Sequence, residues 1–190
     1  MQSILKWVEG GSEKVDAFLF TSSTSVYPQI DGSLVTEESG NNGVSPRGEI
    51  LLDAERLCLH GNREKISKSF VLRFAGLYGP GRHLLLNKVR EGQQINGVSH
   101  RILNLLHQED AVSSILSCLQ SKNLPAGTIF NVSDGRHASR GEIVDWLARE
   151  LQVEHPGFDE KDVPGLPNRK IDNSKIMKSL SWAPRFPGFE

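Results

Sequence analysis

Short apolar runs alternate with longer amphipathic stretches along this chain. The continuous apolar run at residues 17–20 is typical of a strand buried on both faces. Residues 70–74 and 128–132 indicate two more strands, and residues 102–106 another. Strands buried on both faces occur in parallel sheets that helices cover on both sides. The apolar pattern therefore predicts a parallel sheet as the framework of the fold.

Between these runs, apolar residues recur at the spacing of amphipathic helices. Ser45 and Pro46 are typical of a helix N-cap and the first helical residue after it. Ser139 and Glu142 form the pattern of a capping box for another helix. Further helices are expected at residues 4–8, 84–90, 111–119 and 174–180.

The alternation of strands and helices predicts an α/β fold with helices on both faces of the sheet. A length of 190 residues fits a single domain, residues 1–190, with enough chain to bury a sizeable core. Hydrophobic residues make up 37% of the chain and charged residues 24%, which is ordinary for a soluble globular protein.

Charge and cysteine usage restrict the expected partners and compartment. The net charge of −1 and the scattered basic residues predict no nucleic-acid partner, and no apolar run approaches membrane-spanning length. Cys58 and Cys118 are isolated in helical patterns, which favours a reducing compartment. We therefore expect a soluble intracellular protein, cytoplasmic in the first instance, or plastid if a transit peptide was lost.

Two chemistries are not indicated by the sequence. The six histidines show no ligand spacing, so we expect no metal site. The chain also has no Gly-x-Ser-x-Gly elbow, so its serines do not indicate a hydrolase.

Five motifs follow one another in a specific order and spacing. The first is the hydroxyl-rich stretch 21–25 with Val26 and Tyr27, directly after a predicted strand. The others are Leu72-Arg73-Phe74-Ala75-Gly76-Leu77-Tyr78-Gly79-Pro80-Gly81, His107-Gln108-Glu109-Asp110, Phe130-Asn131-Val132-Ser133-Asp134, and Asp172-x-Ser174-Lys175 with Trp182-x-Pro184. Together they resemble the signatures of extended, atypical short-chain dehydrogenases/reductases, the NAD-dependent epimerase/dehydratase family.

The resemblance implies a doubly wound, Rossmann-like sheet with NAD or NADP as cofactor, and it concerns the carboxyl-terminal portion of that fold. The family begins with a strand, a Gly-x-x-Gly-x-x-Gly turn and a helix whose amino terminus receives the pyrophosphate. No such pattern precedes Thr21. We therefore expect that this chain lacks the first strand–helix units and the glycine-rich loop, and that alone it binds NAD(P) weakly or not at all.

The family's catalytic positions can be compared with this sequence one by one. In the family, a Ser or Thr polarises the substrate oxygen, a Tyr transfers a proton and a Lys assists the Tyr. Ser23 matches the first position, but Arg47 stands at the Tyr position and Leu51 at the Lys position. An arginine stays protonated and cannot relay a proton. Ser23 and Arg47 are thus the candidate catalytic residues, without the usual relay.

Contacts with cofactor and substrate are also implied by the resemblance. Substrate-side elements are expected mainly in residues 77–106 and 134–190. The expected cofactor contacts are Thr21, Ser22, Ala75, Gly76 and Leu77, and the expected substrate contacts are Tyr27, Arg82 and His83.

Each candidate also has a purely structural interpretation. Ser23 can cap the backbone after a strand, and Arg47 can be a solvated charge in the first turn of a helix. Tyr27 is expected to be a half-buried packing residue rather than an acid. Arg73 is expected to bind a carboxylate or the backbone, and His107 with Asp110 to form a helix-capping pair.

Two functions therefore stay open at the level of sequence. The first is an NAD(P)-dependent, epimerase/dehydratase-like oxidoreductase acting on a sugar nucleotide or another small polar carbonyl or hydroxyl compound, if completed by the missing half. The second is a non-catalytic binding or scaffold protein with the same fold. In either case, loss of the usual neighbour leaves the apolar strand at 17–20 on a sheet edge, which predicts self-association.

Overall fold

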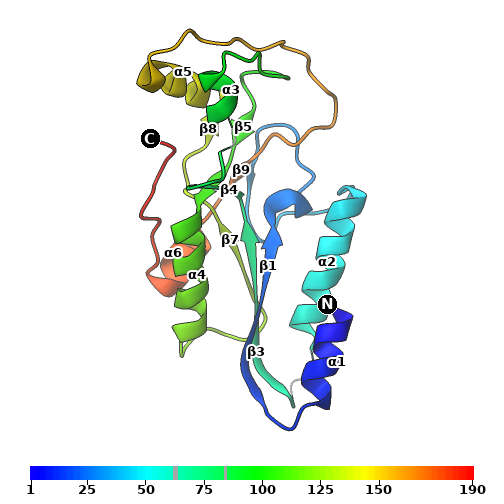
Figure 1. The fold of residues 1–190 in the computed structure, drawn as a ribbon. Coiled ribbons are helices and arrows are strands. Elements are labelled where there is room, and N and C mark those ends of the chain that lie inside the picture. The colour runs from blue at the N-terminus through cyan, green and yellow to red at the C-terminus, as the bar shows by residue number, and fades with distance from the viewer. Residues whose placement is uncertain (62–63, 84) are drawn as a thin grey trace.

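A three-stranded parallel sheet forms the centre of the molecule. The computed structural model describes residues 1–61, 64–83 and 85–190 of the chain. The strands are β1 (Val15–Ser23), β3 (Ile66–Phe74) and β7 (Thr128–Val132), with β3 in the middle (Figure 1). The predicted parallel sheet is confirmed, and its order is that of the last three strands of the doubly wound fold.

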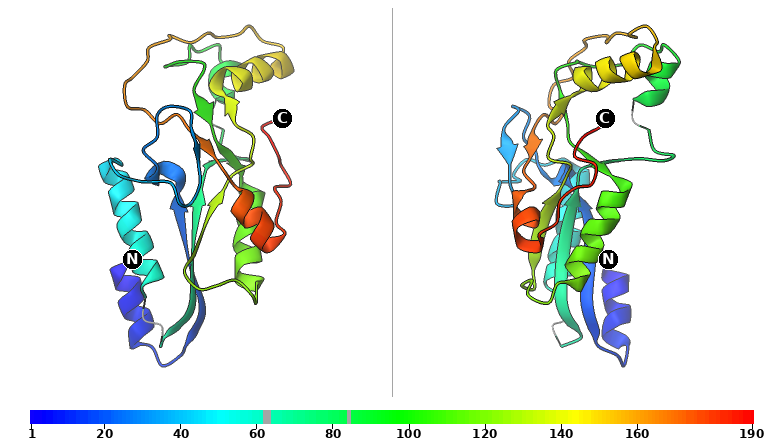
Figure 2. Two further views of the ribbon diagram at one scale, coloured as in Figure 1. Left: turned by 180° about the vertical axis from the view of Figure 1, so that it is seen from behind. Right: turned by 90° about the vertical axis from the view of Figure 1, so that its left-hand side faces the viewer.

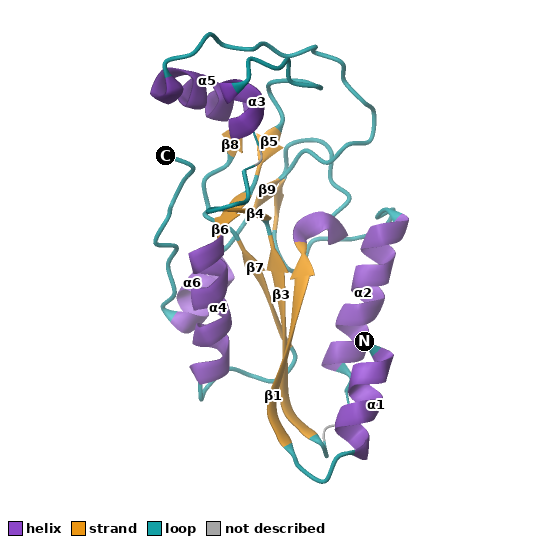
Figure 3. Ribbon diagram, in the orientation of Figure 1, coloured by secondary structure: helices purple, strands orange, loops and turns teal. Residues whose placement is uncertain are grey.

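Helices cover both faces of this sheet, as Figure 3 shows. On one face lie α1 (Gln2–Gly10) and α2 (Pro46–Leu59), and α1 buries Leu5 and Val8 against Ile66. On the other face lie α4 (Gln108–Gln120) and α6 (Ser174–Leu180). Their apolar residues join Phe70, Leu72 and Phe130 in the largest buried cluster. This arrangement confirms the predicted layers of the α/β fold.

Helix capping follows the sequence signals closely. Ser45 Oγ accepts a hydrogen bond of 3.3 Å from the Gly48 N–H, with Pro46 as the first helical residue. Ser139 Oγ accepts one of 3.2 Å from the Glu142 N–H, while the Glu142 carboxylate accepts from the Ser139 N–H. Both patterns satisfy backbone donors that a helix start leaves free.

A second lobe lies beyond the carboxyl ends of the long strands, at the top of Figure 1. Among the described residues, it contains three short strand pairs, two helices and a 3-10 turn. The pairs are β2 (Leu34–Val35) with β9 (Lys170–Ile171), β4 (Gly76–Tyr78) with β6 (Leu105–His107), and β5 (Ile102–Leu103) with β8 (Ala138–Ser139). The remaining elements are η1 (Thr24–Val26), α3 (Leu86–Arg90) and α5 (Arg140–Leu151).

The carboxyl-terminal segment ties the two lobes together. After α6 the chain runs back towards α5, as both views in Figure 2 show. Asp110 in α4 accepts backbone hydrogen bonds from Arg185 and Phe186, at 2.8 and 3.0 Å. Further along, Tyr78 Oη donates to the Gly188 carbonyl oxygen at 2.6 Å. These bonds place the last residues of the chain against the second lobe.

Three expectations from the sequence need correction. The single strand expected at 102–106 is two short strands, β5 and β6, because they pair with different partners. The helix expected at 84–90 is α3, which begins at Leu86, and Leu84 lies outside the described residues. The run 17–20 is half-buried rather than buried on both faces, because β1 stands at an edge of the sheet.

Both cysteines are buried and reduced, one in each helical layer. Cys58 of α2 donates to the Phe70 carbonyl oxygen at 3.5 Å, and Cys118 of α4 belongs to the cluster on the opposite face. Burial raises the pKa of Cys58 to about 11 and that of Cys118 to about 12. Within the described residues, no helix is long and apolar enough to cross a membrane.

Candidate functional site

A row of polar residues crosses the sheet near its carboxyl end. Ser22 of β1, Arg73 of β3 and Asn131 of β7 stand opposite one another in the register of the three strands. All three are buried. In a parallel sheet, adjacent residues in register point to the same face. The side chains of this row therefore share the face that α2 covers.

Arg73 makes a buried, bidentate ion pair with Glu55 of α2. Its Nη2 lies 2.7 Å from Glu55 Oε2, and its Nε lies 3.0 Å from Oε1. Ser22 Oγ donates to the same carboxylate at 2.5 Å. Buried charges need such pairing, because removing them from water is costly. The expectation that Arg73 binds a carboxylate is confirmed, whereas the sequence did not mark Glu55 as its partner.

Tyr27 continues the same network. Its hydroxyl accepts a hydrogen bond of 2.8 Å from Arg73 Nη1 and donates one of 2.7 Å to Asn131 Oδ1. The side chain is only 1% exposed, so it is fully buried rather than half-buried. Burial raises the pKa of Tyr27, although nearby Arg73 opposes the shift. Tyr27 therefore holds the network together and offers no open surface to a substrate.

We call the hydrogen-bonded set of Ser22, Glu55, Arg73, Tyr27 and Asn131 the polar brace. It extends to the loop before α2, because Glu37 Oε1 accepts from the Asn131 backbone N–H at 2.6 Å. Burial raises the pKa of Glu37. The polar brace thus joins all three strands of the sheet just below the ends from which the candidate site rises.

The two segments expected to face the nicotinamide lie side by side. Ser23 ends β1 opposite Phe74 of β3, so residues 21–23 and 75–77 leave adjacent strands at the same edge. The second segment is fixed by backbone bonds, from the Ala75 N–H to Val132 at 3.0 Å and from the Gly76 N–H to Asn104 at 2.9 Å. Thr21 and Gly76 are exposed. Ser22, in contrast, points towards Glu55.

Ser23 and Arg47 occupy different surroundings. Ser23 caps η1, with its Oγ accepting from the Ser25 N–H at 3.2 Å. Arg47 lies exposed in the first turn of α2, while Leu51 packs against a buried cluster that includes Tyr27. Gly48 allows this close packing, since a Cβ there would lie 3.1 Å from the Ser25 carbonyl oxygen. The helix therefore starts directly beside the end of β1.

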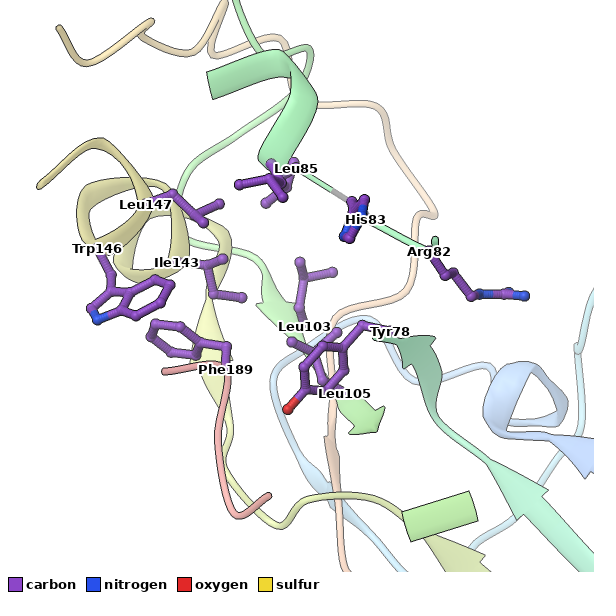
Figure 4. A pocket seen from close by; sticks show the side chains of 11 residues that line it. Tyr78, Arg82, His83, Leu85, Leu103, Leu105, Ile143, Trp146, Leu147 and Phe189 are labelled. Carbon is purple, nitrogen blue, oxygen red and sulfur yellow. The ribbon is translucent and has the colours of Figure 1, made fainter. Parts of the chain in front are cut away.

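A pocket of about 290 Å³ opens in the second lobe. It lies between α3, α5, the β4–β6 and β5 strands and the carboxyl-terminal segment (Figure 4). Its lining consists of Tyr78, Arg82, His83, Leu85, Leu86, Leu103, Leu105, Ile143, Trp146, Leu147 and Phe189. Arg82 and His83, both expected substrate contacts, are thus part of one pocket with residues that the sequence did not single out.

Aromatic side chains shape the walls of this pocket. The rings of Trp146 and Phe189 meet edge to face at 5.6 Å. Tyr78 presents its ring to the pocket while its hydroxyl binds Gly188, and burial raises the pKa of Tyr78 to about 12. No sequence motif marks Trp146 or Phe189, because they come from an amphipathic helix and a terminal segment that only the fold brings together.

The third motif has its expected role at His107 but not at Asp110. His107 caps α4, with Nδ1 accepting from the Glu109 N–H at 3.3 Å, as predicted. Asp110 does not share in this capping. Both of its carboxylate oxygens accept from the carboxyl-terminal segment instead, so the expectation of a capping pair was wrong for Asp110. Within the described residues, no group of histidine, cysteine and acidic side chains could hold a metal ion.

Comparison with known proteins now adds to this geometry. Protein YeeZ of Escherichia coli (strain K12) is 32% identical over 188 residues, which are 98% of this chain and 65% of YeeZ. UDP-glucuronic acid 4-epimerase from Bacillus cereus, solved with UDP-glucuronic acid and NAD, is 25% identical with a TM-score of 0.82 over 97% of this chain and 61% of the epimerase.

A dehydratase gives a similar match. The dTDP-glucose 4,6-dehydratase of Bacillus anthracis, solved with NAD, is 20% identical with a TM-score of 0.78 over 97% of this chain and 61% of the dehydratase. The chain has the fold of the NAD-dependent epimerases and dehydratases. The resemblance seen in the motifs is thereby confirmed for the fold, although no family model matches the sequence.

The chain corresponds to only part of the length of these proteins. It spans about 65% of the length of YeeZ and 61% of the length of the two enzymes. The two enzyme structures contain bound NAD, and the epimerase structure also contains UDP-glucuronic acid. The chain thus has part of the Rossmann-type fold of these NAD-bound enzymes, and each match covers 97–98% of its residues.

Proposed function

We propose that this chain is the substrate side of an NAD(P)-dependent, epimerase/dehydratase-like oxidoreductase, within a single domain formed by residues 1–190. Its substrate is a small carbonyl or hydroxyl compound, with sugar nucleotides as one candidate class. One observation carries the proposal: residues 21–23 and 75–77 meet at the carboxyl edge of the sheet, where open α/β folds bind their ligands. The chain continues from there into the pocket beside Arg82 and His83.

The residues present fit one end of the dinucleotide. Thr21, Gly76 and their neighbours offer a backbone-lined wall at the strand ends, suited to a flat nicotinamide ring. The bound cofactor would supply hydride transfer. Residues 1–20 contain no glycine-rich strand–turn–helix pattern that could hold a pyrophosphate. We therefore expect this chain to bind NADH or NADPH more weakly than micromolar in calorimetry, an affinity that needs about 8 kcal/mol.

Ser23 is the residue best placed to polarise a substrate oxygen. Its Oγ already accepts a hydrogen bond from the Ser25 N–H. A hydroxyl keeps one donor besides its acceptor capacity, so the Ser23 O–H stays available to a carbonyl or alcohol oxygen. Arg47 supplies positive charge at the start of α2, but it cannot exchange a proton near neutral pH. Ser23 and Arg47 therefore orient and polarise the substrate in this proposal.

The competing proposal is a non-catalytic binding protein. Leu51 stands where the family has a lysine and is packed against a buried cluster, so no proton relay forms along α2. This observation favours binding without turnover. The polar brace also withdraws Tyr27 from any exchange with a substrate.

Turnover in a completed protein separates the two proposals. A glycine-rich strand–helix segment from a relative, fused ahead of residue 1, is expected to permit NAD(P)H oxidation with a panel of aldehydes and keto sugars. Ser23→Ala should then lower kcat by about a hundredfold, in the usual range for a lost polarising donor. Ser25→Ala is the matched control, because Ser25 Oγ has no hydrogen-bond partner within the described residues. Equal losses in both variants, or no turnover with tight substrate binding, would favour the binding protein.

A further proposal concerns the outer edge of β1. We propose that two copies of this chain associate there, because β1 has a sheet neighbour on one side only within the described residues. Phe18, Leu19 and Phe20 on this strand remain half-buried. An apolar edge with free backbone groups is a ready template for another strand.

A further inference from the structure

We infer that the pocket under α5 binds the apolar ring of a small aryl or cycloalkyl alcohol or carbonyl compound, and not the nucleoside diphosphate of a sugar nucleotide. This inference deepens the proposed function, because it names a substrate class for the same site. Only its catalytic consequence rests on the proposed function. Binding to the pocket needs no dinucleotide, so the two can be tested apart.

The lining of the pocket is almost entirely apolar. Eight of the eleven described residues that line it are leucine, isoleucine, tryptophan or phenylalanine. Leu105 and Ile143 are buried and form the inner part of the wall, next to Leu103. A volume of about 290 Å³ lies at the lower end of the range for small-molecule sites. The pocket therefore suits one compact apolar group.

Two polar side chains of the wall are already engaged by backbone carbonyl oxygens. Tyr78 Oη donates to the Gly188 carbonyl oxygen, and Arg82 Nε donates to the Leu77 carbonyl oxygen at 2.9 Å. Of the described lining residues, only Arg82 carries a permanent charge, and Figure 4 shows it turned away from the other side chains. A diphosphate needs cations or several N–H donors once it leaves water. This lining provides neither in its interior.

The aromatic walls are held in place before any ligand arrives. Phe189 packs edge to face on Trp146. The Arg136 guanidinium carbon lies over the Phe189 ring, 4.8 Å from the ring centre. Arg136 Nη1 also pairs with Oε2 of Glu190, the residue after Phe189, at 2.6 Å. A preformed aromatic wall binds a flat ring with little loss of side-chain freedom.

The residues at the end of the pocket near β4 determine where the polar end of the ligand lies. Tyr78 ends β4, whose first two residues belong to the expected nicotinamide wall. Arg82 and His83 are exposed beside this strand. A ligand with its ring among Trp146, Phe189 and Ile143 would thus direct a hydroxyl or carbonyl oxygen towards the strand ends and His83.

Nuclear magnetic resonance of the whole chain tests this binding directly. The three tryptophans give three indole N–H signals: Trp7 is 79% exposed on α1, Trp182 is buried beside α4, and Trp146 lines the pocket. Titration with 2-naphthylmethanol is expected to shift the Trp146 signal saturably and to leave that of Trp7 unchanged. UDP and UDP-glucuronic acid are expected to leave all three unchanged. Trp146→Phe assigns the signal.

A matched pair of variants locates the site. Leu147→Phe narrows the pocket and should weaken naphthylmethanol binding by at least about tenfold, as one misfitting group does in an apolar site. Leu151 lies one helical turn further along α5 and outside the described lining. Leu151→Phe should therefore leave the affinity for naphthylmethanol unchanged. The inference is overturned if UDP shifts Trp146 more strongly than the alcohol does, if no saturable shift occurs, or if both variants bind equally. Failure of turnover in the completed enzyme, with this binding intact, would refute only the proposed function.

Discussion

The two outer strands of the sheet, β1 and β7, flank the same central strand but differ in how deeply their side chains are buried. On β7, Phe130, Asn131 and Val132 are buried, and the Glu37 carboxylate caps the outward N–H of Asn131. On β1, Phe18 to Phe20 are only half-buried. Both strands are apolar, so composition does not explain the difference. Burial of an apolar strand depends on what lies next to it in space. The loop before α2 contacts β7 through Glu37, whereas β1 has only β3 as a strand neighbour among the described residues.

The polar brace is what the two strands have in common. It reaches Ser22 on β1 and Asn131 on β7 through Arg73 and Glu55. The unequal strands are therefore tied at their carboxyl ends, where the candidate site begins, and differ mainly along the rest of their length.

Breaking the polar brace should have the largest effect. Arg73→Met leaves the Glu55 carboxylate buried without its cation, and we expect a loss of about 3–5 kcal/mol in the free energy of unfolding. Urea denaturation of the chain measures this loss. The double variant Glu55→Leu with Arg73→Met should recover most of it, since no lone charge remains. A loss below about 1 kcal/mol in the single variant would show that water reaches the pair.

The second-largest effect should be a pH dependence of the free energy of unfolding that arises beside β7 and not beside β1. Burial raises the pKa of Asp134, just after β7, from 3.8 to about 7, with Asp110 adding to the shift and Arg136 opposing it. The folded state thus holds this proton more tightly than the unfolded state, so stability falls as pH rises between these two values. We expect a decrease of roughly 2–3 kcal/mol between about pH 5 and pH 8.

Asp134→Asn is the matching variant, because its amide oxygen can still accept from the Arg136 N–H. It should flatten the pH dependence and be more stable than the wild type at about pH 8. An unchanged slope in urea denaturation across this pH range would contradict the assignment to Asp134.

Removing one hydroxyl from the polar brace should have a moderate effect. Tyr27→Phe leaves Asn131 Oδ1 and one Arg73 nitrogen without their partner, at a cost of about 1–3 kcal/mol. Tyr78→Phe removes a hydroxyl that bonds a single carbonyl oxygen in a half-buried place, and should cost less. Thermal unfolding of the two variants side by side checks the order, and the reverse order would refute the central place given to Tyr27.

The smallest expected effect concerns the open edge of β1. Phe18→Lys should weaken self-association at least about tenfold, or about 1.4 kcal/mol, because a charge at an edge discourages strand pairing. Ile50→Lys is the control, since Ile50 is an apolar residue exposed on α2 instead. Sedimentation at tens of micromolar measures both. A sharply monomeric wild type with cooperative unfolding would remove the reason for the proposal.

The parts of this fold that local sequence determines could be predicted well. Apolar runs located the three long strands, and Ser45 and Ser139 located two helix starts, because periodicity and capping depend on neighbours in the chain. The split of residues 102–106 could not be predicted, since β5 and β6 owe their separation to partners far along the chain.

The candidate site was predictable only in part, for the same physical reason. Residues 21–23 and 75–77 follow strands directly, so their meeting at one edge follows from parallel pairing. The burial of Glu55 was not foreseen, because a charged residue on an amphipathic helix normally faces water. Trp146 and Phe189 meet across 43 positions of sequence in a pocket that no local pattern describes.

The two cysteines give each helical layer its own chemical reporter. Cys58 sits under α2 and Cys118 under α4, on opposite faces of the sheet, and the raised pKa of each thiol keeps it protonated and inert while its layer stays closed. A thiol reagent can therefore reach one of them only when its own layer opens. The rates at which the two sulfurs are labelled report, separately and without any engineered probe, how often each side of the sheet comes apart.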